Sequence, residues 1–254
     1  MRTLFFSVCW IAAILAFPFA GNAQWGDVEM TFLYDGKPPE LKPVAESRFD
    51  RLRIHDQSWL FDKEGGVKNV VVRLLLEKDV KLPIHPDFEK AKGTSVRVDI
   101  AGGYFEPRIA IKYTNQNLTF ANLNPFAHSV RGVSTKNQPF NVTVPENRMV
   151  TLEAERDGLN THDPAVAVLT DNIHPEMKGY FFIHSHPYAS VSDSKGKVIL
   201  KNVPVGEWTF VMWHEVNGYI MKGALDGVAA EWPKGRMKIK VEPKVNQVGV
   251  IKFH

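Results

Sequence analysis

The side chains best suited to chemistry in this sequence are two histidines, an aspartate and a methionine. Asp171, His174 and Met177 follow one another at intervals of three residues, and His128 lies upstream of them. Imidazole nitrogens and carboxylate oxygens bind Cu(II) and Zn(II), and a thioether is a soft, weak ligand. The sequence therefore predicts a site for a divalent copper or zinc ion at these four residues, with Met177 axial or idle.

The same four residues also fit a loop that holds no metal. An aspartate in a turn accepts hydrogen bonds from the backbone N–H groups that follow it, and Asp171 is placed to do so. His128 and His174 could then bond to its carboxylate. Hydrogen bonds between these side chains distinguish the two interpretations. Side chains that bond to each other in a closed cluster favour the metal-free loop.

Three further histidines are the basis of a second hypothesis. His184 and His186 are two residues apart on a predicted strand, so their side chains face the same way. His214 ends another predicted strand. A second metal site at His184, His186 and His214 is one interpretation. The alternative is that these histidines lie at the surface or bond to the backbone. His162 is assigned to a polar loop.

Strands must deliver the first four candidate ligands to one place. Residues 165–170 form a predicted strand that leads into the Asp171 loop, and residues 178–183 form the strand that leaves it. Pro175 stiffens the loop between them, since its ring fixes the backbone angle φ. We expect His128 to lie on a neighbouring strand, so that the four side chains converge at one end of a sheet.

Alternation of apolar and polar residues dominates the rest of the chain. It recurs in five segments, namely residues 28–32, 96–100, 109–113, 118–120 and 237–241. Such alternation predicts strands with one buried face, and the mainly apolar residues 70–76 predict a strand buried on both faces. The sequence predicts no long amphipathic helix, and at most a short helix fits residues 87–92. The predicted fold class is all-β.

A second β-sandwich is predicted from residues 190–215, which have the pattern strand, turn, strand. This segment resembles the transthyretin-like regulatory modules found beside carboxypeptidases. The resemblance implies an outer sandwich made of residues 24–92 and 188–254. Residues 93–187 would form a separate domain inserted into it, at a surface loop where insertions are tolerated. The alternative is that any two adjacent hairpins produce this pattern.

The mature chain as a whole resembles a family of exported cupredoxin-like proteins of planctomycete type. This family is similar to plastocyanin and amicyanin and is often labelled as methylamine utilisation proteins. The resemblance rests on short runs in the same order, at residues 34–39, 70–72, 84–86, 105–107, 128, 172–175 with 177–180, 186–188 and 213–215. It implies a Greek-key cupredoxin-like β-sandwich and a metal-ligand set at positions 128, 171, 174 and 177.

The chain departs from that family at two positions. The family has a cysteine where this chain has Asp171, and a further cysteine near the position of Gly103. A blue-copper site needs the thiolate, so efficient electron transfer is not expected. The expected function is a non-blue module that binds divalent copper or zinc. Two alternatives stay open: a metal-free cell-surface binding or scaffold protein with a vestigial copper site, and a metal-dependent hydrolase.

The N-terminus has the features of a secretory signal peptide. Arg2 precedes an apolar stretch at residues 4–19, and Ala23 ends a small-residue cleavage site. Cleavage after Ala23 would give a periplasmic, secreted or cell-surface protein with no membrane span in the mature chain. The alternative is an uncleaved anchor, for which residues 4–19 are short compared with a bilayer span of about 20 residues.

Composition excludes several functional classes. The single cysteine, Cys9, falls in the predicted signal peptide, so the mature chain lacks a haem attachment motif, iron–sulfur ligands and disulfides. The formal net charge is +3 without a basic run, which argues against nucleic acid. The sequence has no nucleotide-binding loop, serine nucleophile elbow or zinc-protease motif. We therefore do not expect an enzyme.

Aromatic residues give the one indication of a partner. Trp208, Trp213, Tyr219 and Trp232 lie close together in the sequence. On an exposed sheet face they would suit a protein or a surface glycan as partner. The alternative is ordinary core and hairpin packing.

Overall fold

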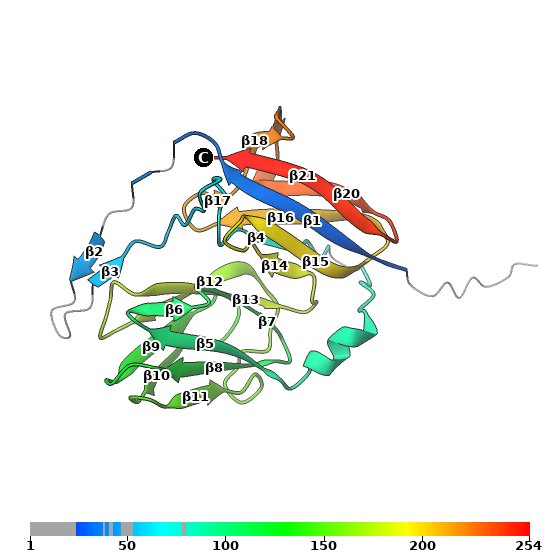
Figure 1. Ribbon diagram of the computed structural model, residues 1–254. Helices are drawn as coiled ribbons and strands as arrows, with labels where there is room; N and C mark the ends of the chain where they lie inside the picture. Colours follow the sequence, from blue (N-terminus) through cyan, green and yellow to red (C-terminus); the bar gives the residue numbers. More distant parts are fainter. Residues whose placement is uncertain (1–23, 38, 41–42, 47–52, 78–79) are drawn as a thin grey trace, which may run out of the picture.

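The computed structural model describes residues 24–37, 39–40, 43–46, 53–77 and 80–254. The predicted signal peptide, residues 1–23, lies outside these ranges. Strands dominate the described chain, whose helices are two short 3-10 helices, η1 (Pro86–Ala91) and η2 (Pro233–Gly235) (Figure 1). The all-β prediction is confirmed, and η1 is the short helix expected at residues 87–92. Within the described ranges, neither helix has the length and apolar character needed to cross a membrane.

The strands form two β-sandwiches and a small ribbon of β2 (Pro43–Glu46) and β3 (Arg53–His55). The outer sandwich occupies the upper part of Figure 1. One of its sheets has the order β15 (Lys197–Pro204), β1 (Trp25–Tyr34), β21 (Val245–Phe253), β18 (Lys222–Leu225) and β19 (Val228–Glu231). The other has the order β14 (Ala189–Val191), β4 (Val71–Leu74), β16 (Gly206–His214) and β17 (Gly218–Tyr219), with β20 (Arg236–Val241) also paired to β16.

Strand β1 shows why these segments form a sandwich. Its alternate residues Val28, Met30 and Phe32 are buried, and the residues between them are partly exposed. This is the pattern of a strand with one face on a core. β1 runs antiparallel to β15 and parallel to β21, so the first and last strands of the described chain lie side by side. Their inward side chains share one core with Tyr188 and Phe210.

The middle sandwich occupies the lower part of Figure 1 and contains the strands between β4 and β14. One sheet has the order β10 (Phe140–Val144), β9 (His128–Val133), β12 (Asp163–Asp171), β13 (Lys178–His184) and β7 (Ile109–Tyr113). The facing sheet has the order β11 (Met149–Leu152), β8 (Asn117–Asn122), β5 (Ser95–Ala101) and β6 (Tyr104–Glu106). Its own core includes Val98, Leu118, Leu169 and Phe181.

The two cores draw on different parts of the chain. Core residues of the outer sandwich come from both sides of the middle segment, whereas residues 96–183 supply the middle core together with Ile54. The limits of 93 and 187 for an inserted domain stay a prediction. The buried strand expected at residues 70–76 is shorter than that, since β4 covers Val71–Leu74, and Leu75 and Leu76 are partly exposed.

Apolar side chains join the two sandwiches along one seam. Val71 and Trp213 of the outer sandwich meet Ile109, Tyr180 and Phe182 of the middle sandwich. Because these side chains belong to neither of the two larger cores, the seam is a contact surface of its own.

Polar bonds cross the same seam. Nε and Nη2 of Arg108 donate to the two carboxylate oxygens of Glu215 at 2.6 and 2.7 Å. Nη2 of Arg73 donates to the backbone oxygen of Pro164 at 2.9 Å. A bidentate arginine–carboxylate pair has a defined geometry as well as a favourable energy, so it fixes how the two sandwiches meet.

Candidate functional site

The four predicted ligands converge at one end of the middle sandwich. His128 is the first residue of β9, and Asp171 is the last residue of β12. These strands are antiparallel neighbours, with Asp171 opposite Val130, so the start of one lies beside the end of the other. His174 and Met177 follow in the loop between β12 and β13. All four side chains belong to residues that are at most 1% exposed.

Both carboxylate oxygens of Asp171 accept hydrogen bonds. Oδ1 accepts from the backbone N–H groups of Ile173 and His174 at 2.8 and 2.9 Å. Oδ2 lies 2.9 Å from Nδ1 of His128. Asp171 therefore caps its own loop, as aspartates do in turns, and also ties that loop to β9.

Asn124 determines which nitrogen of His128 carries the proton. Its Oδ1 accepts from the backbone N–H of Gly102 at 3.2 Å, so its Nδ2 group is the one that points elsewhere. Nδ2 lies 2.9 Å from Nε2 of His128 and donates to it. With the Nε2 lone pair in use, the ring carries its proton on Nδ1 and donates that proton to Asp171.

His174 and Met177 are packed inside the protein. The ring of His174 lies 5.1 Å from the ring of His128, and the Phe126 ring lies 5.2 and 5.5 Å from the two histidines. Nδ1 of His174 is 3.9 Å from Oε1 of Glu176. Met177 belongs to the core of the middle sandwich. The loop therefore delivers both residues to the place that the sequence predicts.

Asn124, His128, Asp171 and His174 are the Asp171 cluster. Three of its members are joined by side-chain hydrogen bonds, and His174 is bonded through its backbone. Throughout the described part of the chain, no three His, Cys, Asp or Glu side chains are arranged as a ready-made metal site. Because His128, Asp171 and His174 are almost fully buried, a substrate cannot touch them. The arrangement suits a structural role.

A second group of histidines lies at the other end of β12. The rings of His184 and His186 are nearly parallel, 7° apart, with their centres separated by 5.5 Å, so they face the same way as predicted. The structure adds His162, whose ring lies 5.6 Å from His184 and 6.1 Å from His186. His162 directly precedes β12, while Asp171 ends it. These three residues are the His184 cluster.

His214 is not brought to the His184 cluster. Its ring stacks on Trp59 at 4.3 Å and lies 5.9 Å from Phe253, both of which pack on the core of the outer sandwich. Successive side chains of a strand point to opposite faces, and its neighbour Trp213 is the one that faces the seam. Burial lowers the pKa of His214 to about 4.

Sequence analysis did not predict two members of these clusters as site residues. Asn124 stands four residues before His128. A short polar residue so close to a candidate ligand in the sequence could have indicated a hydrogen bond between them. His162 was assigned to a polar loop because no local pattern shows that β12 and β13 pair with Asp163 opposite Ile183. The Arg108–Glu215 pair joins residues 107 positions apart and has no local signal.

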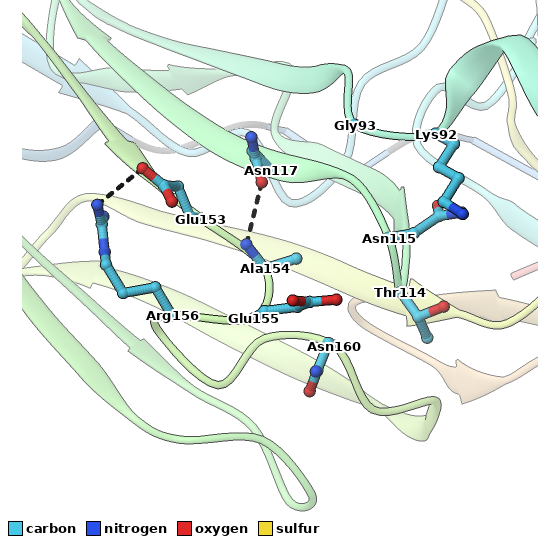
Figure 2. Close-up of a pocket in the computed structure, with 10 residues that line it drawn as sticks. All are labelled: Lys92, Gly93, Thr114, Asn115, Asn117, Glu153, Ala154, Glu155, Arg156 and Asn160. Atoms are coloured by element: carbon cyan, nitrogen blue, oxygen red, sulfur yellow. Dashed lines mark hydrogen bonds and ion pairs between the residues drawn. The ribbon is translucent and has the colours of Figure 1, made fainter.

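Cavities lie near both ends of the middle sandwich. One of about 320 Å³ adjoins the seam and is lined by Met177, Tyr104, Arg108 and Glu215, among others. Another, of about 440 Å³, lies at the end opposite the Asp171 cluster (Figure 2).

In the cavity of Figure 2, two hydrogen bonds join residues of the lining. Nη1 of Arg156 donates to Glu153 at 2.8 Å, and Oδ1 of Asn117 accepts from the backbone N–H of Ala154 at 3.0 Å. The lining residues include none of the predicted ligands. This cavity is therefore separate from the predicted ligands.

The late aromatic residues do not form one exposed face. Trp213 and Trp232 are 9% and 5% exposed and belong to different apolar clusters. Nε1 of Trp208 donates to the backbone oxygen of Pro204 at 2.6 Å. Tyr219 is 43% exposed. Core packing explains the two buried tryptophans, and a protein or surface glycan as partner stays a prediction.

No family model matches the chain, and no curated protein matches it. Among solved structures, a reduced amicyanin variant is 17% identical, with a TM-score of 0.29, over 35% of this chain and 82% of that one. A purple cupredoxin from Nitrosopumilus maritimus is 11% identical, with a TM-score of 0.27, over 35% of this chain and 98% of that one. A copper-containing nitrite reductase from Thermus scotoductus is 18% identical, with a TM-score of 0.32, over 41% of this chain and 28% of that one.

Proposed function

We propose that this protein is an exported, cupredoxin-like binding or scaffold protein in which hydrogen bonds, and not a metal ion, hold the Asp171 cluster together. One observation carries the proposal: Oδ1 of Asp171 accepts two backbone hydrogen bonds, and Oδ2 accepts the ring proton of His128. An ion at this place would have to displace that proton before it could bind Nδ1.

The polarity of the surrounding groups supports the same conclusion. A metal-bound histidine donates its second N–H group to an acceptor, which orients the ring. Here the second nitrogen of His128 faces the Nδ2 donor of Asn124 at 2.9 Å. The residue that orients His128 therefore selects the tautomer whose Nδ1 is already protonated.

The donor set also lacks the ligand on which copper redox chemistry depends. Asp171 stands where the resembled family has a cysteine, and a carboxylate supplies hard oxygens in place of a soft thiolate. Cu(I) would be poorly held, so we assign no electron-transfer step to this chain. A hydrolytic role would need an open metal position facing a substrate, and His128, Asp171 and His174 are at most 1% exposed.

A second candidate function is the binding of divalent copper or zinc by the Asp171 cluster, with Met177 axial or idle. The observation that favours it is spacing. Oδ2 of Asp171 is 2.9 Å from Nδ1 of His128, and the His128 and His174 rings are 5.1 Å apart. Ligands that share one ion at about 2.0–2.1 Å stand at similar separations.

The test is a calorimetric titration of the purified, tag-free protein with Cu(II) and Zn(II), beside Asp171→Cys and His174→Asn. We expect His174→Asn to leave any observed metal binding unchanged. We expect the cysteine variant to show no intense blue absorption, because Asn124 still holds the ring proton of His128 on Nδ1 and the loop loses the carboxylate that caps it. One-to-one binding by the natural protein that disappears in His174→Asn would overturn the proposal and favour the second candidate.

A further inference from the structure

A groove of about 680 Å³ in the outer sandwich is lined by residues of β20 and of β21. β20 pairs only with β16, and β18 pairs with β21 only at Ile251 and Lys252. Within the described residues, one edge of β20 and one edge of β21 at residues 245–249 therefore have no neighbouring strand; both strands lie in the upper part of Figure 1. An unpaired edge offers backbone N–H and C=O groups to an incoming strand.

The two faces of β20 have opposite character. Met237 and Val241 belong to the core of the outer sandwich, whereas Arg236, Lys238 and Lys240 are exposed. Because successive side chains of a strand point to opposite faces, β20 has one apolar face and one cationic face. A strand that added to its free edge would continue both faces.

The lysines of β20 carry charge that no acid balances by direct contact. Within the described part of the chain, neither Lys238 nor Lys240 forms an ion pair or a side-chain hydrogen bond. Glu207 stands opposite Lys240 on β16 and is not bonded to it. By contrast, Lys197 on the other sheet lies 2.8 Å from Glu29. The cationic face of β20 is therefore free to attract an acidic partner.

The groove itself combines this charge with an apolar floor. Its one acidic lining residue, Glu242, is already paired with Lys244 at 2.6 Å. Trp232, Ile239 and Val248 also line it and pack on the core of the outer sandwich, and the last two are partly exposed. Apolar side chains of an added strand would bury surface here, while its acidic side chains would face the lysines.

We propose that β20 binds an extended, acidic segment of a partner protein by strand addition. Acidic residues of that segment would alternate with apolar ones, so that the acids lie across from Lys238 and Lys240 and the apolar residues enter the groove beside Ile239. Opposite charges on paired strands are stabilising and like charges are destabilising. A second copy of this chain, added through its own β20, would bring lysines together and fits less well.

This inference names the partner class for the binding role in the proposed function and rests on that role. It does not depend on the Asp171 cluster, which belongs to the middle sandwich and contributes no residue to the groove. Separate measurements can therefore test the partner and the metal-free cluster.

The test is fluorescence anisotropy of the full mature protein with a labelled peptide in which glutamate alternates with valine over six residues, the length of β20. We expect one peptide to bind per protein, and added salt to weaken binding because exposed charges are screened. Hydrogen exchange followed by nuclear magnetic resonance should show new protection at the β20 amides that face away from β16.

Charge-matched variants assign the site. Lys238→Gln combined with Lys240→Gln should weaken binding roughly tenfold, since two cross-strand charge pairs are lost. Lys195→Gln combined with Lys252→Gln removes two exposed lysines outside the groove and should leave binding unchanged. Both pairs of substitutions lie at exposed positions, so both variants should fold.

Two control peptides separate strand addition from attraction by charge alone. One has lysine in place of glutamate and should not bind, and the other has the same composition with the glutamates and valines in separate blocks and should bind far more weakly. Absence of binding would mean that the lysines only shield an open edge, and this overturns the inference. Equal binding of the block peptide, or equal losses in the two pairs of variants, also overturns it.

The proposed function fails on a different result. Metal binding that disappears in His174→Asn overturns the metal-free Asp171 cluster and leaves binding of the alternating peptide as it was. Failure of the peptide to bind overturns only the partner inferred here.

Discussion

The two histidine clusters of the middle sandwich differ in how their buried nitrogens are satisfied. In the Asp171 cluster, Nδ1 and Nε2 of His128 each have a partner at 2.9 Å. In the His184 cluster, both nitrogens of His184 have none among the described residues. The two histidines are equally buried. Burial alone therefore does not show how a histidine side chain is held, and its hydrogen-bond partners do.

The clusters can be compared in one molecule because β12 separates them. His162 precedes this nine-residue strand and Asp171 ends it, which places the two clusters roughly 25–30 Å apart at about 3.3 Å per residue. Substitutions at such distances have nearly additive effects on stability. A prediction that changes one cluster can therefore use the other as a reference.

Removing the central acceptor should have the largest effect. Asp171→Ala leaves the Ile173 and His174 N–H groups and the Nδ1–H of His128 without their acceptor. We expect the free energy of unfolding to fall by about 3–5 kcal/mol, since each unsatisfied buried donor costs about 1–3 kcal/mol. Urea denaturation measures this, with Asn172→Ala on the exposed side of the same loop as control. A loss below about 1 kcal/mol would show that the cluster is not structural.

Acid should destabilise the protein through His214, a buried histidine that belongs to neither cluster. Its pKa is about 4 in the folded protein, compared with 6.5 for an ordinary histidine, so the unfolded chain takes up a proton first as the pH falls. The free energy of unfolding therefore begins to fall below pH 6.5. The loss reaches roughly 3 kcal/mol near pH 4, at about 1.4 kcal/mol per pH unit.

Urea denaturation between pH 4 and 7, in the presence of a chelator, measures that loss. His214→Phe should flatten the pH dependence over this window, because phenylalanine does not titrate. Equal slopes for the natural protein and the variant would mean that His214 is not buried in its neutral form.

Changing the polarity beside His128 should move the proton of its ring from Nδ1 to Nε2. Asn124→Asp replaces the donor that faces Nε2 by an acceptor, so the ring proton should move to Nε2 and free the Nδ1 lone pair. We expect a stability loss of about 1–3 kcal/mol and new affinity for Zn(II). Proton–nitrogen correlation spectra of the histidine rings report which nitrogen is protonated. An unchanged tautomer would refute the orientation assigned to Asn124.

The smallest expected effect is a gain in stability. His184→Phe replaces an imidazole with two unpartnered nitrogens by an apolar ring that can stack as His184 does on Phe182, at 5.8 Å. Removing unsatisfied buried polar atoms should stabilise the metal-free protein by about 1 kcal/mol. Thermal unfolding with a chelator measures the change. Destabilisation of that size would indicate that His184 has a partner such as an ordered water.

Local patterns predicted the strands around both clusters but not which strands become neighbours. The alternation in β1 and β5 and the loop from Asp171 to Met177 follow from short-range chemistry. The capping role of Asp171 was one of the two interpretations open from the sequence. The contacts of Asn124 with His128, of His162 with His184 and of Arg108 with Glu215 depend on strand pairing across long stretches of chain, which no local period encodes.

The parallel pairing of β1 with β21 imposes an order in time on folding. β21 consists of the nine residues Val245–Phe253, is the last strand of the described chain and pairs along one edge of β1. As the chain emerges during synthesis, the middle sandwich has all its strands well before the outer one does. Until the last strand arrives, one edge of β1 lacks its partner and is open to pairing with another chain. A variant truncated before Val245 would therefore be prone to aggregation.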